Sequence, residues 1–478
     1  MNMRKTKIIC TLGPAVDHAE TIERLIRTGM NAARFNFSHG SHAEQLARLN
    51  MFKKVRDTLG APVATILDTK GPEIRIKTFA DGPVTLEQGQ GFILTTDDVP
   101  GDGRRVSVTY ANLHKEVGPG CRILVDDGLI ELRVQKVEGH EIHCEVENGG
   151  PLSSNKSINI PDVHILLPSL TDKDREDLKF AVDNDFDFIA ASFVRKASDV
   201  EDIRAELRKH GGDNIRIIAK IENREGVENL EGIIAASDGI MVARGDLGVE
   251  IPAHEVPILQ KKMIKATIRA GLPVITATQM LDSMIRNPRP TRAEVSDVAN
   301  AVFDGTSCVM LSGETASGKY HIEALSTMVN TVTAAEEAID YWGRFRERSL
   351  LPVVSGISDA ITHSCCLTAM DLNASAILAA TRSGYTAKVI SRFRPACPIV
   401  ALCQNESTRR QLAISWGVHP YLSGEVDSTD RMFSLAVDVA RKENAVQIGD
   451  TVVITAGVPL GQSGTTNLIK AQIVEGGL

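Results

Sequence analysis

The chain has 478 residues and a formal net charge of −8 at pH 7. That length exceeds one ordinary domain and predicts about three. The acidic balance and the lack of a basic run argue against a nucleic-acid-binding protein. The first residues, MNMRKTKIICTLGP, lack the apolar core of a secretion signal, and no apolar run is long enough to cross a bilayer. We therefore expect a cytoplasmic protein with neither nucleic acid nor membrane as a partner.

Eight apolar runs have the length of buried strands, and each ends in polar or glycine-rich residues. They lie at 7–12, 32–37, 63–67, 186–191, 215–219, 239–242, 273–275 and 307–311. Helical patterns separate them, for example at 19–28, 198–210, 256–270 and 292–303. This alternation predicts an α/β fold with a closed (β/α)8 TIM barrel. An open doubly wound sheet is the alternative, because the pattern does not show closure.

One interval, 71–168, interrupts this alternation directly after the third strand. Its helical period disappears, and short strands at 122–125, 129–137 and 141–147 alternate with turns, which is typical of hairpins. We predict an inserted all-β domain that acts as a lid over the barrel. A decorative or interface domain is the alternative.

A second α/β region follows the barrel, with strands expected at 376–380, 398–402 and 451–455 and helices at 357–370 and 431–442. The predicted organisation is therefore a barrel at 1–70 and 169–342, the insert at 71–168 and a C-terminal domain at 343–478. Composition marks the linker at 343–354 only weakly. The eight cysteines are scattered without a CxxC pair, which indicates reduced thiols and argues against a metal cluster.

The stretch 215–250 carries the densest polar residues at strand ends. Lys220 and Glu222 follow one strand, and Asp246 follows the next, with a helix expected at 225–236. Because the C-terminal ends of parallel strands converge, these side chains should lie on one face. A lysine beside two carboxylates suits a divalent cation and an anionic, phosphorylated substrate. Surface salt bridges at strand ends are the competing interpretation.

Other strand ends add groups of the same kind. Arg34 offers a guanidinium fork suited to a phosphate, and Thr278 places a hydroxyl at the end of the seventh strand. Lys220 can neutralise a group in transfer. Four oxygen donors suit a monovalent cation better than a bare divalent one: Asn36, Ser38, Asp68 and Thr69. Each alone is more often a helix cap than a ligand, so their joint occurrence carries the interpretation.

Eight segments resemble the motifs of the pyruvate kinase family. They are KIICTLGPA (7–15), AARFNFSHG (32–40), LDTKGPEIR (67–75), AKIENREG (219–226), MVARGDLGVE (241–250), TATQMLDSM (276–284), NPRPTRAE (287–294) and MLSGET (310–315). The similarity spans the barrel in order, and the domain order agrees. The resemblance implies transfer of the phosphoryl group of phosphoenolpyruvate to ADP, giving pyruvate and ATP in the last step of glycolysis. It also implies Mg2+ (or Mn2+) and K+ as cofactors and a cytoplasmic homotetramer.

The same resemblance implies substrate and catalytic roles. Lys220, Thr278 and Arg34 would be catalytic, with Arg34 on the substrate phosphate and Lys220 on the phosphoryl group in flight. The backbone of Gly245, with Asp246 and Thr278, would contact the rest of the substrate. Thr278, or a water chain near it and Ser312, would help to protonate the enolate.

Metal and nucleotide ligands are implied in the same way. Glu222 and Asp246 would hold Mg2+ or Mn2+, and Glu73 is the residue type that accompanies potassium dependence in the family. The potassium ligands would be Asn36, Ser38, Asp68 and Thr69. The nucleotide would meet Arg75, Lys156, Asn36 and His39.

Departures from the family pattern concern the insert and the C-terminal domain. Ser157 and Asp162 stand where glycine is more common, which puts insert geometry and nucleotide affinity in question. TRSGYT (381–386) resembles the family's effector loop, although Tyr385 often has a basic counterpart. Its expected ligands are Thr381, Ser383, Gly384 and Thr386. Because the loop at 459–467 lacks the tryptophan and arginine of enzymes activated by fructose bisphosphate, we expect a sugar monophosphate or AMP as activator. An unregulated enzyme is the alternative.

Two other function classes compete with this interpretation. One is a different barrel enzyme that binds phosphoenolpyruvate or pyruvate through magnesium and makes or breaks carbon bonds. The other is a non-catalytic sensor that binds sugar phosphates through 381–386. An assay of pyruvate formation with and without potassium separates the three.

Overall fold

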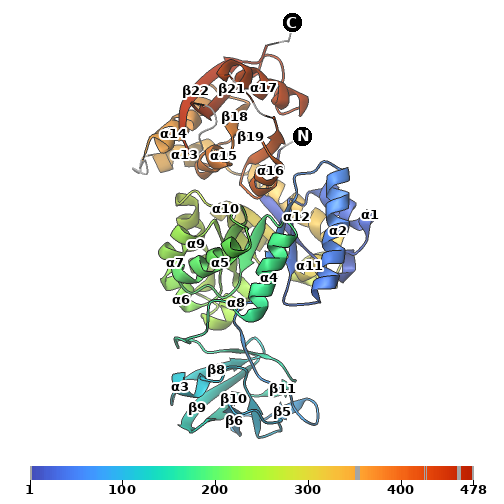
Figure 1. Cartoon of the computed structure of the whole chain (residues 1–478), viewed down its shortest axis with the longest axis vertical. Coiled ribbons are helices and arrows are strands. Elements are labelled where there is room, and N and C mark those ends of the chain that lie inside the picture. Colours follow the sequence, from blue (N-terminus) through green and yellow to red (C-terminus); the bar gives the residue numbers. More distant parts are fainter. Residues whose placement is uncertain (1–2, 350–355, 425, 427, 460–463, 476–478) are drawn as a thin grey trace.

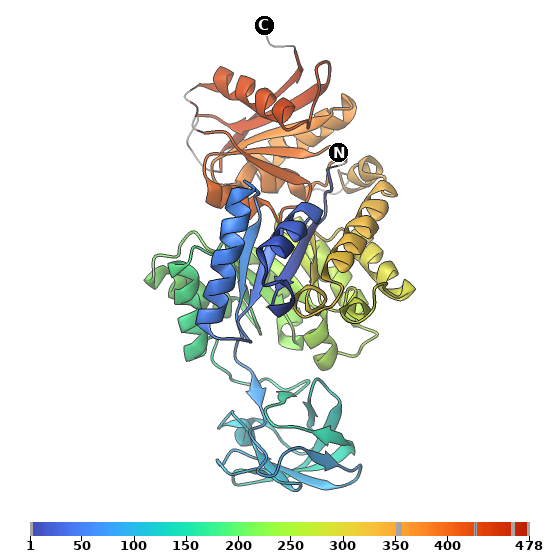
Figure 2. The same cartoon turned by 90° about the vertical axis from the view of Figure 1, so that its right-hand side faces the viewer.

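The structure is a computed structural model that describes residues 3–349, 356–424, 426, 428–459 and 464–475. Three domains follow one another along the long axis of the molecule (Figures 1 and 2). The C-terminal domain lies at one end, the barrel in the middle and the all-β insert at the other end. Within the described residues, no helix combines the length and apolar character needed to span a membrane.

The eight predicted barrel strands all form within the described residues, and they close in the order β1-β17-β16-β15-β14-β13-β3-β2. Neighbouring strands are parallel throughout. Closure confirms the barrel and excludes the open sheet. The strands are β1 (Lys7–Leu12), β2 (Ala32–Asn36), β3 (Ala64–Asp68), β13 (Phe188–Ala191), β14 (Arg216–Ile221), β15 (Gly239–Ala243), β16 (Val274–Ala277) and β17 (Cys308–Leu311).

Helices surround the barrel because each strand is buried on both faces and needs an apolar cover outside. Several begin with a capping box, in which a side-chain oxygen accepts from an N-terminal amide: Ser41 with Glu44, Thr171 with Asp174 and Thr291 with Glu294. The helix expected at 225–236 is divided at Asn229 into α6 and α7. The barrel helices are α1 (Ala19–Thr28), α2 (His42–Thr58), α4 (Asp172–Asp183), α5 (Ala197–Lys209), α6 (Arg224–Glu228), α7 (Leu230–Ala236), α8 (Arg244–Glu250), α9 (Val256–Arg269), α10 (Arg292–Asp304), α11 (Gly313–Ala316) and α12 (His321–Glu337).

The insert is an all-β domain with its own apolar core, which includes Phe92, Leu132 and Ile142. Its main sheet has the order β4-β12-β8-β9-β10-β6-β7, and β11 pairs with β5. Asp126, Asp127 and Gly128 have positive φ, which makes the predicted turn between β8 and β9. The elements are β4 (Ile74–Arg75), β5 (Val84–Leu86), β6 (Gly91–Thr95), β7 (Arg105–Ser107), α3 (Leu113–Glu116), β8 (Arg122–Val125), β9 (Ile130–Glu138), β10 (Glu141–Asn148), β11 (Gly150–Leu152) and β12 (Ser157–Asn159).

The C-terminal domain is a sheet of order β20-β19-β18-β21-β22 with an apolar cluster on each face. The predicted linker at 343–354 begins inside a helix, α13, and its residues 350–354 lie outside the described residues. The proposed domain boundaries stay a prediction. The elements are α13 (Tyr341–Ser349), α14 (Ile357–Asp371), β18 (Ala376–Thr381), α15 (Tyr385–Arg392), β19 (Ile399–Cys403), α16 (Glu406–Leu412), β20 (Val418–Leu422), α17 (Thr429–Lys442), β21 (Thr451–Gly457) and β22 (Thr466–Ile473).

The C-terminal domain covers the end of the barrel where the strands begin. Ile414, just after α16, belongs to the apolar cluster inside the barrel. The guanidinium of Arg410 lies 2.8 Å from the buried carboxylate of Asp187, just before β13. The opposite end, where the strands finish in polar residues, faces the insert.

Candidate active site

The ammonium of Lys220, near the end of β14, is held by three acceptors. Its Nζ lies 2.7 Å from Ser192 Oγ, 3.1 Å from Asp68 Oδ1 and 2.9 Å from Glu222 Oε1. Burial lowers the pKa of Lys220, but the carboxylates of Asp68 and Glu222 more than offset this and hold it above its ordinary value. Lys220 is therefore a fixed positive charge at the barrel mouth.

Asp68, at the end of β3, connects Lys220 to Arg34 on β2. Arg34 Nε donates to Asp68 Oδ2 at 2.6 Å, and Arg34 Nη1 donates to Thr11 Oγ1 at 3.1 Å. Burial raises the pKa of Asp68, but Arg34 and Lys220 outweigh it, so the net shift is downward. The Asp68 carboxylate, with its pKa held low, thus bridges both cations and holds them in place.

Glu222 and Asp246 line the same cleft, as the sequence predicts for two metal ligands. Burial raises the pKa of Glu222 to about 7, Lys220 opposes the rise, and the charge of Asp246 adds to it. A hard divalent cation would supply the missing positive charge, and two carboxylates with water and substrate oxygens suit Mg2+. Among the described residues no group of three or more His, Cys, Asp or Glu is arranged to hold a metal. The residues present fit the ion.

The predicted potassium ligands lie at two adjoining strand ends. Asn36 pairs in register with Asp68 across β2 and β3, and the buried Thr69 follows directly. Asn36 Oδ1 accepts from the amide of Ser38 at 3.1 Å, and Ser38 itself is exposed. Both Asp68 oxygens already contact cations. The donor set, neutral oxygens with one carboxylate, fits a monovalent cation, and these ligand roles stay predictions.

Thr278 and Gly245 form the other side of the mouth. Thr278 Oγ1 accepts from the Gly245 amide at 2.8 Å and donates to the Ala277 carbonyl at 2.7 Å. Thr278 has φ +69°, which is strained for a β-branched residue and is typical of functional sites. Ser312 Oγ is buried and has no hydrogen-bond partner in the described part of the chain, which leaves it available to an ordered water.

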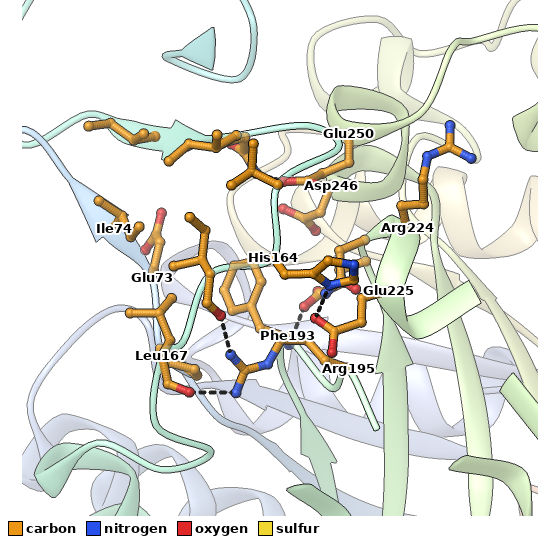
Figure 3. A pocket seen from close by; sticks show the side chains of 18 of the residues that line it. Glu73, Ile74, His164, Leu167, Phe193, Arg195, Arg224, Glu225, Asp246 and Glu250 are labelled. Carbon is orange, nitrogen blue, oxygen red and sulfur yellow. Dashed lines mark hydrogen bonds and ion pairs between the residues drawn. The ribbon is translucent and has the colours of Figure 1, made fainter. Parts of the chain in front are cut away.

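A cleft of about 340 Å³ separates the barrel mouth from the insert (Figure 3). Glu73 and Ile74 approach it from the insert side, whereas Asp246 and Arg224 belong to the barrel. Its acidic lining residues outnumber the basic ones, so an anionic ligand would enter it accompanied by cations. The acidic residues are Glu73, Asp127, Asp162, Glu222, Glu225, Glu228, Asp246 and Glu250; the basic ones are Arg195 and Arg224.

Of the residues predicted to bind the nucleotide, some lie on the insert side of the cleft and others on the barrel side. Arg75 and Lys156 come together where β4 pairs with β12, and each is bound to an acid: Arg75 to Glu73 and Lys156 to Asp126, both at 2.8 Å. His39 is exposed just beyond β2, on the barrel side with Asn36.

The two departures from the family pattern both make contacts. Asp162 adopts φ +64° and lies 3.1 Å from Arg224 Nε, which links the returning chain of the insert to the barrel. Ser157 Oγ donates to Asp127 Oδ1 at 3.0 Å within the insert. Asn159 adds a hydrogen bond of 3.2 Å to Glu250 on α8.

A second cavity, of about 60 Å³, lies in the C-terminal domain and is lined by Thr381, Ser383 and Thr386. Gly384 precedes α15 with φ +82°, and a Cβ there would lie 3.1 Å from the Leu412 side chain, so the turn requires glycine. Residues 460–463 of the loop at 459–467 lie outside the described residues. The effector role of this cavity stays a prediction.

Three further residues at the mouth were missed from the sequence. Ser192 binds Lys220, and the Phe193 amide donates to Glu222 Oε2 at 2.6 Å. Arg195 donates to the carbonyls of Ile165 and Leu167 at 3.0 and 2.8 Å, which anchors the chain returning from the insert (Figure 3). Their position directly after the strand β13 could have indicated a functional role from the sequence.

Comparisons with known proteins agree over both α/β regions. Residues 3–325 match the family model "Pyruvate kinase, barrel domain", and residues 359–472 match "Pyruvate kinase, alpha/beta domain". A pyruvate kinase of Clostridium acetobutylicum is 50% identical over 474 residues, covering 99% of this chain and all of that protein. Pyruvate kinases of Sporosarcina psychrophila and Staphylococcus haemolyticus are also 50% identical, covering 99% of this chain and 81% of each relative.

Proposed function

This chain belongs to the pyruvate kinase family and is a phosphotransferase, and we propose that it transfers the phosphoryl group of phosphoenolpyruvate to ADP, giving pyruvate and ATP. The observation that carries the proposal is Lys220, held by Asp68 and Glu222 at the barrel mouth with Arg34 on the other side of Asp68. Phosphoryl transfer needs positioned positive charge more than covalent help.

In the proposed mechanism, Arg34 binds the substrate phosphate and Lys220 stabilises the charge of the phosphoryl group as it moves. The Gly245 amide and Thr278 orient the rest of the substrate, supported by their mutual hydrogen bond. After transfer the enolate takes a proton. Thr278, or a water bound to the buried Ser312 hydroxyl, would deliver it; that hydroxyl has no hydrogen-bond partner among the described residues.

Glu222 and Asp246 would hold Mg2+ or Mn2+, and Asn36, Ser38, Asp68 and Thr69 would hold K+. When bound, these ions supply positive charge that neutralises the phosphate and carboxylate oxygens of the substrates. Arg75 and Lys156 from the insert, with Asn36 and His39 from the barrel, bind the nucleotide. Arg75 and Lys156 would exchange their present acidic partners for its phosphates.

The proposal is tested by coupling pyruvate formation from phosphoenolpyruvate and ADP to lactate dehydrogenase, with Mg2+ and with or without K+. We expect turnover that depends on both ions. Carbon-bond chemistry without ATP formation would support the other barrel enzyme, and absence of turnover with retained sugar-phosphate binding would support the sensor.

Regulation and assembly are further parts of the proposal. The cavity at 381–386 suits a sugar monophosphate or AMP, because hydroxyls of Thr381, Ser383 and Thr386 line it ahead of α15. Titration with glucose 6-phosphate, ribose 5-phosphate or AMP should lower the half-saturating concentration of phosphoenolpyruvate, and no shift would remove the effector role. We also propose a cytoplasmic homotetramer, which light scattering of the purified chain tests; the cysteines, all unpaired, support a reducing compartment.

A further inference from the structure

We propose that Ser192 is a positioning residue for phosphoryl transfer, and that its hydroxyl directs the ammonium of Lys220 without cancelling its charge. The proposal rests on the function proposed above for the barrel mouth. Ser192 follows β13 directly and is buried, with 7% of its surface exposed. It lies between the ends of β3 and β14.

The hydroxyl of Ser192 has its donor and acceptor directions assigned by its neighbours. Its Oγ lies 2.7 Å from the Thr69 carbonyl oxygen and 3.3 Å from Asp68 Oδ1, so its single proton is best donated to the carbonyl. The lone pairs are then left for Lys220 Nζ at 2.7 Å. This is the shortest of the three contacts made by that ammonium.

The backbone around Ser192 allows the side chain little freedom to turn away. Its amide donates to Thr69 Oγ1 at 3.3 Å, and the next residue, Phe193, has φ +56° and donates its amide to Glu222. On the other side a Cβ added to Gly71 would lie 2.8 Å from Ser192 Cβ, so the segment after β3 packs directly against it. The rotamer of Ser192 is thus set by both neighbouring segments.

The chemical difference between the three acceptors gives Ser192 its role. Asp68 and Glu222 are carboxylates, and each offsets part of the positive field that Lys220 presents to a phosphoryl group. Ser192 is neutral, so it orients the ammonium without that loss. Because an ammonium has three donors and all three have acceptors here, a phosphoryl oxygen can bind only when one acceptor gives way. The neutral Ser192, held by the Thr69 carbonyl, can stay bound to the ammonium while a phosphoryl oxygen replaces one of the two carboxylates.

The test compares Ser192→Ala with Ser307→Ala. Ser307 is also buried and accepts a hydrogen bond of 2.9 Å from Arg394, but it lies at the end of the barrel where β17 begins. We expect Ser192→Ala to slow phosphoryl transfer in a single turnover about ten- to a hundredfold, with the KM for phosphoenolpyruvate changed less than about threefold. Ser307→Ala should keep the wild-type rate although both variants lose stability to urea.

A second pair isolates the hydroxyl from side-chain volume. Ser192→Thr and Ser192→Val add nearly the same bulk and differ in one hydroxyl, so the threonine variant should transfer phosphoryl about tenfold faster or more than the valine variant. Equal rates for that pair, an unchanged rate in Ser192→Ala, or a loss confined to KM would each overturn the proposal. Wild-type protein without pyruvate formation would instead overturn the proposed function, so the two failures are distinguishable.

Discussion

The positive charge of Lys220 balances the buried carboxylates of Asp68 and Glu222. Its removal should therefore lower both the rate of catalysis and the stability of the fold, for different reasons. In Lys220→Met the phosphoryl group loses its fixed cation, and we expect kcat to fall by about 10²- to 10³-fold or more. Asp68 retains Arg34, but Glu222 loses its cation, which should cost about 3 kcal/mol above neutral pH. Coupled assays and urea denaturation at pH 6 and 8 measure the two effects. Lys209→Met, on the surface of α5, is the control, and near-normal turnover of Lys220→Met would contradict the assigned role.

Glu222 should connect metal affinity to pH. Its pKa of about 7 is above the ordinary value of 4.5, so its contribution to stability without metal is complete below pH 4.5 and is lost as pH rises through 7. A divalent cation displaces the remaining proton, and Mg2+ should therefore bind more tightly and release fewer protons as pH rises from 6 to 8. Calorimetry in two buffers of different ionisation enthalpy measures both quantities.

Two glutamate variants provide the comparison for that titration. Glu222→Gln should weaken Mg2+ binding about tenfold or more and remove the proton release. Glu225→Gln alters the same cleft at a residue that pairs with His164 at 3.5 Å, and it should leave both unchanged. Proton release that persists in Glu222→Gln would assign the titration to another group.

At the scale of elements, long periodic segments were predictable and short ones were not. The barrel strands and α1, α9 and α10 form where the hydrophobic pattern places them, because burial on both strand faces or one helix face leaves a clear period. In the insert, β4 and β12 have two and three residues, too few to show alternation. The break at Asn229 between α6 and α7 leaves no mark in the apolar pattern either.

The sequence predicted some residues of the candidate site and missed others. Four charged residues lie at or near strand ends, so the sequence indicates that they meet, and hydrogen bonds and ion pairs join them in the structure: Arg34, Asp68, Lys220 and Glu222. Ser192 was overlooked because a serine after a strand is usually a cap or a surface hydroxyl. The positive φ of Thr278 depends on tertiary contacts and leaves no local sign.

The segment after α16 contributes one side chain, Ile414, to the apolar cluster inside the barrel. Ile414 is fully buried and packs inside the barrel with Ile9, Ile218 and Met310. Ile414→Ala should therefore lower the free energy of unfolding by about 2–5 kcal/mol, while kcat stays within about threefold because the mouth lies at the other end. Ile448→Ala, at a site that is 63% exposed, should change stability by less than about 0.5 kcal/mol. Equal effects in urea denaturation would show that Ile414 leaves the barrel in solution.

At the scale of the whole molecule, the barrel contacts the insert and the C-terminal domain through different kinds of residues. The insert meets it through partly exposed polar pairs, such as Asp162 with Arg224 and Asn159 with Glu250. Such pairs contribute little each and are screened by salt, so this contact should weaken as the salt concentration rises. The C-terminal domain meets the barrel through buried groups, and a change there should be transmitted to the strands.

Lys7, at the start of β1, makes that buried junction sensitive to pH. Its Nζ donates to the Val418 carbonyl at 2.7 Å, and burial, with Arg4 adding and Glu336 opposing, lowers its pKa to about 7. The unfolded chain keeps the proton up to its ordinary value of 10.5, so between pH 7 and 10.5 the unfolded state binds more protons and stability rises with pH.

Lys7→Met removes this titration and retains the length of the side chain. The free energy of unfolding of the wild type, relative to Lys7→Met, should rise between pH 7 and 9, with a slope that approaches about 1.4 kcal/mol per pH unit above the folded-state pKa. Urea denaturation at pH 7, 8 and 9 measures it, and Lys179→Met, at an exposed lysine of α4, is the control variant. A difference for Lys7→Met that does not change with pH would mean that water reaches the ammonium of Lys7. The barrel and the C-terminal domain would then separate at this junction more readily than their buried contacts indicate.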